Sequence, residues 1–166
     1  GALAGAEINQ SLTNKIYDGE YEFNAKYSNN ELKDAINNGE FAFYYDANDI
    51  RVLKDINTFI SFSTEKNSDF SNNQVIRVLD STAKDIARIF NNYYLGKIQN
   101  DALGRDVFKS ELINYFKKLQ AIRAINNFSA DDISIKKGVE KGDVIVDLII
   151  EPVASMDKLY MKCVIE

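Results

Sequence analysis

The residue types that most often carry out chemistry in proteins are scarce in this sequence of 166 residues, which has no histidine and a single cysteine, Cys163. Without an imidazole, the chain has no Ser-His-Asp triad, no Cys-His dyad and no zinc site of the HExxH type. One cysteine cannot form an internal disulfide or a cysteine-rich zinc site. Several large classes of enzyme and metalloprotein are therefore excluded for this chain.

A pair of adjacent carboxylates, Asp131 and Asp132, is the remaining acid-base or metal candidate. The pair follows Ser129 directly before a predicted strand, where an acidic turn is also expected. A catalytic or metal site would need more acids clustered nearby, and the sequence places none there. Neither of the phosphate-binding patterns GxGxxG and GxxxxGK[ST] occurs. We therefore predict no catalytic residue, no metal and no cofactor, with a carboxylate-dependent hydrolase or a monomeric ligand-binding module as alternatives.

The overall composition, 45% apolar and 27% charged, is typical of one globular domain or of one with a small appendage. A chain of this length can bury a sufficient core without metals or disulfides. No apolar run approaches the 18 residues of a membrane-spanning helix, so we predict no membrane insertion. The net charge of −5 makes the chain a poor binder of polyanions, so we predict no nucleic-acid partner.

Charge is distributed unevenly along the chain. Residues 1–70 have a net charge of −6, residues 71–125 of +4 and residues 126–166 of −3. A basic middle third between acidic flanks would suit docking onto an acidic protein surface. Ordinary solvated helix faces would give the same numbers, because most surface charges contribute little energy.

The first third of the chain is predicted to be mostly β. Apolar and polar residues alternate at residues 21–27, as a half-buried strand requires. A short helix follows from residue 29 and stops at the Asn37-Asn38-Gly39 sequence. Strand-like residues 41–45 and 50–62, joined by a turn at residues 46–49, predict a hairpin.

Two amphipathic helices are predicted in the basic middle third. The first is capped by Ser71 or Asn72 and ends at Gly96, and the second runs from about residue 105 to 125, after a break at Gly104. Each helix carries basic residues away from its apolar stripe. On the first these are Arg77, Lys84 and Arg88, and on the second they are Lys109 and Lys117 with Ile113 between them.

The last forty residues return to strand patterns at residues 133–136, 143–151 and 159–165. The middle segment is apolar on nearly both faces, as a covered central strand would be. We therefore predict an α+β fold, in which a small mixed sheet packs against the two main amphipathic helices and the chain ends in a strand arm. Such an arm can pair within its own sheet or with the open edge of a neighbour.

Five ordered blocks of sequence resemble the C-terminal part of contractile phage tail sheath proteins, in the branch found in Gram-positive prophages and phage-tail-like bacteriocins. The blocks cover nearly the whole chain and are residues 55–59 (DINTF), 73–80 (NQVIRVLD), 91–97 (NNYYLGK), 104–109 (GRDVFK) and 157–161 (DKLYM). The resemblance implies that residues 1–48 end the preceding sheath domain. Residues 49–166 would then be the inner, tube-facing C-terminal domain, including the arm at residues 157–166.

The same resemblance implies a structural role without enzymatic activity. Sheath subunits would form a helical polymer of stacked rings around a tail tube and contract to drive the tube through a cell envelope. The partners implied are further copies of the chain, the tail tube protein, the baseplate and the tail terminator. The location implied is the virion tail, or a headless bacteriocin or other contractile injection particle, assembled in the bacterial host cytoplasm.

Site residues follow from the resemblance as well. The implied exchanged arm is Leu159, Tyr160, Met161, Lys162, Cys163, Val164 and Ile165. The implied acceptor strand of the neighbouring copy is Val144, Ile145, Val146, Asp147, Leu148, Ile149 and Ile150. The implied tube contact is one of the two basic helix faces, and the sequence leaves the choice between them open.

Overall fold

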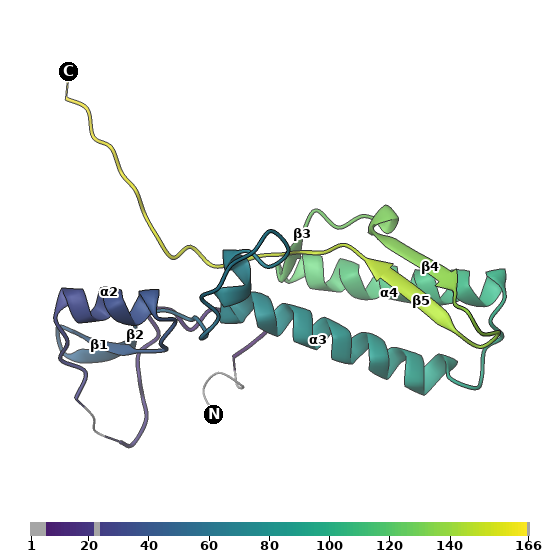
Figure 1. Ribbon diagram of the computed structural model, residues 1–166, viewed down its shortest axis with the longest axis horizontal. Coiled ribbons are helices and arrows are strands. Elements are labelled where there is room, and N and C mark those ends of the chain that lie inside the picture. Colours follow the sequence, from purple (N-terminus) through teal and green to yellow (C-terminus); the bar gives the residue numbers. More distant parts are fainter. Residues whose placement is uncertain (1–5, 22–23, 166) are drawn as a thin grey trace. The chain divides into compact units, whose positions relative to one another are not determined.

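The computed structural model describes residues 6–21 and 24–165 and separates the chain into two compact units. The first unit comprises Gly1–Ile76 and Ala154–Glu166, and the second is Arg77–Val153. The predicted α+β class is confirmed, although the described residues form two-stranded antiparallel sheets instead of one mixed sheet (Figure 1). The predicted boundary between residues 48 and 49 remains a prediction.

The first unit is built around helix α2 (Asn29–Asn37) and a hairpin of strands β1 (Phe43–Asp46) and β2 (Asp49–Val52). Hydrogen bonds from the backbone and hydroxyl of Ser28 to the Glu31 carboxylate begin the helix and lower the pKa of Glu31. Gly39, with φ +70°, follows the helix, as predicted. The hairpin pairs Phe43 with Val52 and Asp46 with Asp49, which confirms the predicted turn.

The prediction of a strand at residues 21–27 is wrong for the residues that the structure describes there. Tyr21 and Tyr27 are exposed and only Ala25 is buried, while residues 22–23 lie outside the described part. A competing segment explains the error, because Tyr17 N donates to Ile50 O at 2.8 Å and so occupies the edge of β2. The predicted strand at residues 50–62 also ends early, at Val52.

A buried carboxylate holds the segment after β2 to the N-terminal part of the chain. Asp55 is 2% exposed, and its Oδ2 accepts a hydrogen bond from Leu12 N at 3.0 Å. The chain then reaches a short 3₁₀ helix, η1 (Ser68–Ser71), and an isolated bridge between Ile56 and Asn72 leads into helix α3 (Asn73–Ile89). Asn72 Oδ1 accepts from Gln74 N at 2.8 Å, so the predicted cap by Asn72 is confirmed.

The second unit contains the rest of α3, a π-helical turn η2 (Phe90–Tyr94) and helix α4 (Ala102–Ala121). Side chains at spacings of four, four and three residues form the buried face of α4: Phe108, Leu112, Phe116 and Leu119. Rings from the end of α3 pack onto this face, with the centroids of Phe90 and Phe108 5.7 Å apart. The second helix starts earlier than predicted, because Asp101 caps it and Gly104 lies within its first turn.

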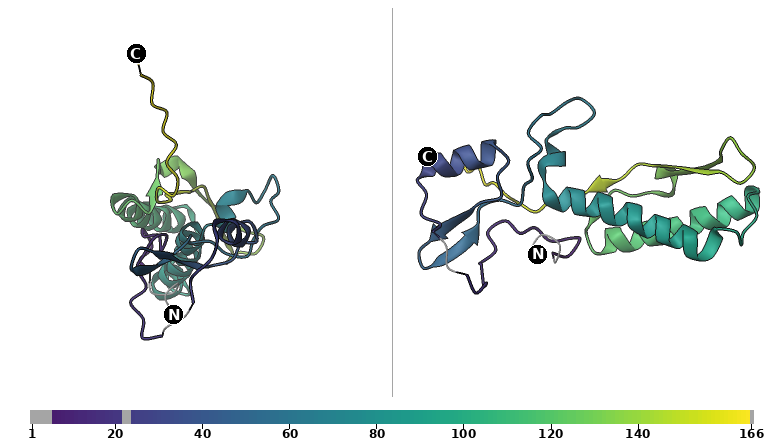
Figure 2. Two further views of the ribbon diagram at one scale, coloured as in Figure 1. Left: turned by 90° about the vertical axis from the view of Figure 1, so that its left-hand side faces the viewer. Right: turned by 60° about the horizontal axis from the view of Figure 1, so that its bottom comes forward.

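Strands complete the second unit as two antiparallel pairs. Strand β4 (Ile133–Lys137) pairs with β5 (Val144–Leu148), and β3 (Ile125–Asn126) pairs with β6 (Glu151–Pro152). A 3₁₀ turn, η3 (Ala130–Asp132), precedes β4. The views agree that the β4–β5 hairpin lies along the helices of this unit (Figures 1 and 2).

The expectation that residues 143–151 form a covered central strand is wrong in this single chain. Strand β5 ends at Leu148 and pairs on one edge with β4. Its outer face leaves large apolar side chains in solvent, with Ile145 46% and Ile149 72% exposed. A strand with an open edge and exposed apolar residues is typical of a partner-binding element.

Candidate functional site

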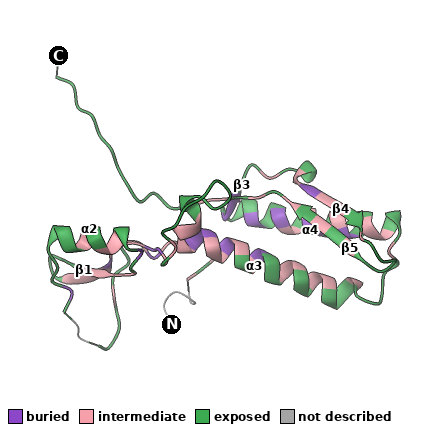
Figure 3. Cartoon of the chain, viewed as in Figure 1, coloured by how far each residue is buried: buried purple, intermediate pink, exposed green. Residues whose placement is uncertain are grey.

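The C-terminal arm is the most exposed apolar segment of the described chain. Leu159, Tyr160, Met161, Val164 and Ile165 are each at least 74% exposed, and Ile165 reaches 98%. Cys163 is exposed as well. The arm forms no strand in this single chain, and Figure 3 shows it as one continuous exposed stretch. Contiguous apolar exposure on this scale indicates a surface that is covered by a partner.

A buried amide anchors the base of the arm inside the first unit. Gln74 is 2% exposed, and its Oε1 accepts hydrogen bonds from Ser155 N at 3.0 Å and from Ser155 Oγ at 3.1 Å. Both donors belong to one residue, so a single side chain fixes where the arm leaves the unit. From Met156 to Ile165 the arm side chains are exposed.

Strand β5 presents unpaired backbone groups along its outer edge. Gly138 N donates to Asp143 O at 2.9 Å, and Ile149 N donates to Asp132 O at 3.0 Å. The N–H and C=O of one residue point to the same side of an antiparallel strand. The backbone N–H and C=O groups of the odd-numbered β5 residues therefore point toward β4. The N–H and C=O groups of Val144, Val146 and Leu148 therefore point away from β4, and no strand pairs with them in the described part of the chain.

An apolar groove follows this open edge. It is lined by α3, the start of η2, α4 and β5, through Ala83, Ile86, Ala87, Phe90, Phe108, Val144 and Val146. The two alanines lie one helical turn apart, and their small side chains leave space between α3 and β5. A side chain that enters the groove beside β5 therefore meets little obstruction. Every lining side chain is apolar, which matches the groove to an apolar strand face.

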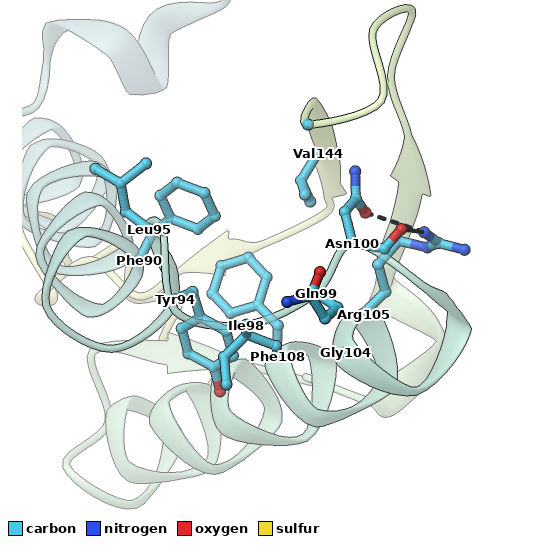
Figure 4. Close-up of a pocket in the computed structure, with 12 residues that line it drawn as sticks. Phe90, Tyr94, Leu95, Ile98, Gln99, Asn100, Gly104, Arg105, Phe108 and Val144 are labelled. Atoms are coloured by element: carbon cyan, nitrogen blue, oxygen red, sulfur yellow. Dashed lines mark hydrogen bonds between the residues drawn. The ribbon is translucent and has the colours of Figure 1, made fainter.

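A smaller pocket adjoins the groove at the start of β5, sharing Phe90, Phe108 and Val144 with it (Figure 4). Its volume of about 80 Å³ is well below the roughly 300–1,000 Å³ of typical ligand sites. The polar groups on its rim form hydrogen bonds to backbone carbonyl oxygens of the chain. Asn100 Nδ2 donates to the carbonyl oxygens of Lys141 and Asp143, and Arg105 Nη1 donates to Asn100 O at 3.1 Å.

The basic residues of α3 are not presented as one exposed row. Nε and Nη1 of Arg77 are buried, whereas Lys84 is exposed. Arg88 is exposed and forms an ion pair with Asp85 at 2.9 Å. The predicted α3 face therefore has one exposed lysine whose charge no acidic group of the described chain pairs.

The basic residues of α4 lie along one line of the helix, at spacings of four residues. Lys109 and Ile113 are half-buried and Lys117 is exposed. Neither lysine has an acidic partner within ion-pair distance in the described part of the chain, so both charges are available to a partner.

The carboxylates of Asp131 and Asp132 occupy a local turn. Ser129 caps η3, accepting from Asp131 N at 3.3 Å, and Ser129 N donates to Asp132 Oδ2 at 2.7 Å. Within residues 6–21 and 24–165, no group of three or more acidic, cysteine or histidine side chains could hold a metal ion. No helix in the same residues has both the length and the apolar character needed to cross a membrane.

Comparison with known proteins identifies the family of this arrangement. Residues 65–166 match the family described as the phage tail sheath C-terminal domain. The chain belongs to this family. The match covers more than half of the chain and includes the groove, the open edge and the arm.

Individual relatives agree with the family match. The phage-like element PBSX protein XkdK of Bacillus subtilis is 32% identical over 96% of this chain and 36% of its own length. The sheath tail protein Lin1278 of Listeria innocua superposes with a TM-score of 0.84 at 32% identity, over 96% of this chain and 38% of that one. Both come from Gram-positive bacteria, as the sequence resemblance predicted.

A more distant likeness shows the fold alone. The contracted helical sheath of the anti-feeding prophage is 15% identical, with a TM-score of 0.75 over 99% of this chain and 47% of that one. This chain spans little more than a third of the curated and Gram-positive relatives it matches.

Sequence reasoning proposed the arm and the acceptor strand, but it expected that strand to be covered and missed the groove beside it. The groove joins residues about sixty positions apart, such as Ala83 and Val146, and no local pattern connects them. The pair Ala83 and Ala87, one turn apart on an otherwise large-residue helix, was the available signal. The anchor between Gln74 and Ser155 was also missed, because nothing in the sequence marks a glutamine as buried.

Proposed function

We propose that this chain is the inner, tube-facing part of a tail sheath subunit with a structural role. Copies polymerise as stacked rings around a tail tube, joined by strand exchange, and the polymer contracts to drive the tube through a cell envelope. Residues 1–48 then end the preceding domain and residues 49–166 form the C-terminal domain. Besides other copies, the partners are the tube protein, the baseplate and the terminator of a phage tail or tail-like particle assembled in the host cytoplasm.

One observation carries this proposal: an exposed apolar arm and an open strand edge with an apolar groove occur in the same chain. Each is unfavourable in water and each supplies what the other lacks. The arm offers unpaired backbone groups and apolar side chains. The edge of β5 offers the matching backbone groups and an apolar surface, so that one copy can complete the sheet of the next.

The magnitudes favour exchange within a polymer. About six backbone hydrogen bonds at about 1 kcal/mol each, with burial of arm side chains at about 1.5–3 kcal/mol for a large one, give on the order of 10 kcal/mol. Association costs an estimated 4–15 kcal/mol, so one isolated exchange is marginal. In a ring whose subunits are already held together, the same contact is effectively intramolecular and becomes strong.

For the tube contact we propose the α4 face formed by Lys109, Ile113 and Lys117. In the described part of the chain, two lysines without acidic partners flank an apolar residue there, whereas on α3 Arg77 is half-buried with its Nε and Nη1 buried, and Arg88 is paired with Asp85. An exposed charge contact of this kind is screened by salt and is weaker than a strand pair. It is therefore the contact suited to release during contraction, while strand exchange keeps the subunits linked.

The direct test is deletion of residues 159–166 from the full-length sheath protein. We expect a folded subunit that no longer assembles, because residues 159–165 are exposed and contribute nothing to the buried core. Sheath yield and length are measured by electron microscopy and sedimentation, and circular dichroism checks folding. A matched control replaces Val139, an exposed apolar residue of the β4–β5 loop, by Ser and should assemble normally. Sheaths of unchanged yield and length from the truncated protein would refute exchange.

A further inference from the structure

We infer that the exchanged arm docks in one defined register, with Lys162 of one copy opposite Asp147 of the next and with its odd-numbered residues facing the groove. This inference rests on the strand exchange proposed above and specifies its geometry.

The groove selects the inward face of the arm. In β5, Val144 and Val146 line the groove, while Ile145 and Asp147 are exposed on the opposite face. Neighbouring strands keep directly opposed residues on the same face of the sheet, so the arm must direct every second side chain inward. The odd-numbered set is Leu159, Met161, Cys163 and Ile165, which is entirely apolar. The even-numbered set contains Lys162, whose charge would be costly to bury in an apolar groove.

The outer face then determines the register. Among the outward-facing residues of the arm (Tyr160, Lys162 and Val164) and of residues 145–149 (Ile145, Asp147 and Ile149), the charged ones are Lys162 and Asp147. Pairing these opposite charges places Lys162 opposite Asp147. The remaining outward pairs are two apolar ones, between Tyr160 or Val164 and the exposed Ile145 or Ile149. This register covers both exposed isoleucines and pairs opposite charges.

Asp147 has capacity for a second cation. Its Oδ2 accepts from Lys136 Nζ at 2.7 Å across the hairpin, and both side chains are more than half exposed. Its Oδ1 has no hydrogen-bond partner in the described part of the chain. Lys162 on the other side of Asp147 would complete a row of alternating charge across three strands.

Other registers are poorer on each count. A shift of two residues keeps the odd face inward but places Lys162 opposite Ile145 or Ile149 and leaves Asp147 facing Tyr160 or Val164. Because Tyr160 and Val164 flank Lys162 as Ile145 and Ile149 flank Asp147, parallel and antiparallel docking give the same outward pairs. The assignment therefore does not depend on chain direction.

A charge swap tests the register in the full-length sheath protein. All variants carry Lys136→Gln, which removes the ion pair between residues 136 and 147. The charge of residue 147 can then interact only with the arm. Lys162→Glu and Asp147→Lys each replace attraction by repulsion. Each should raise the protein concentration needed for sheath assembly about threefold to tenfold, the effect of roughly 1 kcal/mol at a cross-strand pair. The double variant should return to within about twofold of the Lys136→Gln protein, as measured by sedimentation.

Two outcomes would contradict the inference at different levels. If the double variant assembles no better than the two single effects combined, Lys162 and Asp147 are not opposed and the register is wrong. This result leaves strand exchange standing, provided that deletion of residues 159–166 abolishes assembly. If the deletion leaves assembly intact, the exchange itself is refuted.

In a full-length protein whose cysteines outside residues 1–166 are replaced by Ser, Cys163 tests the inward face directly, because it is the one cysteine of residues 1–166. With Ala87→Cys in the groove wall, mild oxidation of assembled sheaths should give disulfide-linked ladders on a non-reducing gel. The control Ser110→Cys places a thiol on an exposed part of α4 away from the groove and should give none. A second arm variant, Cys163→Ser with Val164→Cys, moves the thiol outward and should lose the ladder. A ladder of equal strength from that variant would overturn the inward assignment.

Discussion

At the scale of single residues, one hydrogen-bonded cluster links the two long helices of the second unit. Tyr115 of α4 donates its hydroxyl proton to Asp85 Oδ2 of α3 at 2.9 Å, and Arg88 Nη2 donates to Asp85 Oδ1 at the same distance. Burial and the hydrogen bond to Asp85 raise the pKa of Tyr115 well above its usual value. The cluster holds the helices that form the groove walls.

Replacing Tyr115 by Phe removes this hydrogen bond with little change in shape. We expect the free energy of unfolding to fall by about 1 kcal/mol. The pH dependence is the sharper readout. Because the folded state keeps the Tyr115 proton to higher pH than the unfolded state, its contribution is complete below the usual tyrosine pKa of about 10 and is lost as pH rises above it.

Above about pH 10, the free energy of unfolding should therefore fall less steeply with pH in Tyr115→Phe than in the unaltered protein. Denaturant melts at a series of alkaline pH values measure the slope. Tyr93→Phe, at an exposed position on η2, is the matched control and should change neither the stability nor the slope. An unaltered slope in Tyr115→Phe would show that Tyr115 titrates alike in the folded and unfolded states.

At the scale of elements, the helix α4 contains a glycine with a steric role. Gly104 lies in the first turn, and a Cβ there would collide with the carbonyl oxygen of Gln99, which belongs to the loop before the helix. The sequence was interpreted as a helix break at this glycine. The structure instead uses it for the close approach of that loop.

Gly104→Ala should destabilise the protein, opposite to the gain of about 1 kcal/mol that this change gives at an open helical position. The sign follows from the backbone contact, which cannot yield without displacing the loop that carries Asn100. Thermal unfolding measures the effect. Ser110→Ala, farther along the same helix and exposed, should change stability little or raise it. A stabilised Gly104→Ala protein would show that the loop can move without cost.

Sequence periodicity predicted the elements that carry their own signal. The apolar spacing of Phe108, Leu112 and Leu119 gave α4, and the Asn37-Asn38-Gly39 sequence gave the end of α2. Strands were less predictable, because a segment forms a strand only if it, and no competing segment, pairs with an available strand edge. The edge of β2 is paired with residues 16 and 17, which have no strand pattern, and not with the alternating residues 21–27.

The candidate site divides in the same way. The arm and the acceptor strand are each one continuous segment of sequence. Alternation and the family resemblance were therefore enough to propose them. The groove is a tertiary feature of α3, α4 and β5, and the burial of Arg77 depends on packing that its helical position does not reveal. These two features decide the inward face of the arm and the preferred basic helix, and only the structure supplies them.

At the scale of the whole molecule, the proposed sheath needs two contacts of unequal strength. Strand exchange combines backbone hydrogen bonds with apolar burial and changes little with salt. Contact between exposed charges and a tube weakens as ionic strength rises, because the Debye length is about 10 Å at 0.1 M salt and about 3 Å at 1 M. Raising salt should therefore detach sheath from tube before it separates sheath subunits from one another.

The α4 face can be tested by Lys109→Glu with Lys117→Glu in the full-length protein. Reversal of two charges should make tube-bound extended sheaths scarcer, while tube-free contracted polymers persist because the arm and groove are unaltered. Electron microscopy counts of the two particle types give the ratio. Lys84→Glu on α3, compared with Lys117→Glu alone on α4, reverses one charge outside the Asp85 cluster and should leave tube-bound sheaths near their normal number. If the α3 variant loses them and the α4 variant retains them, the tube docks on α3 instead.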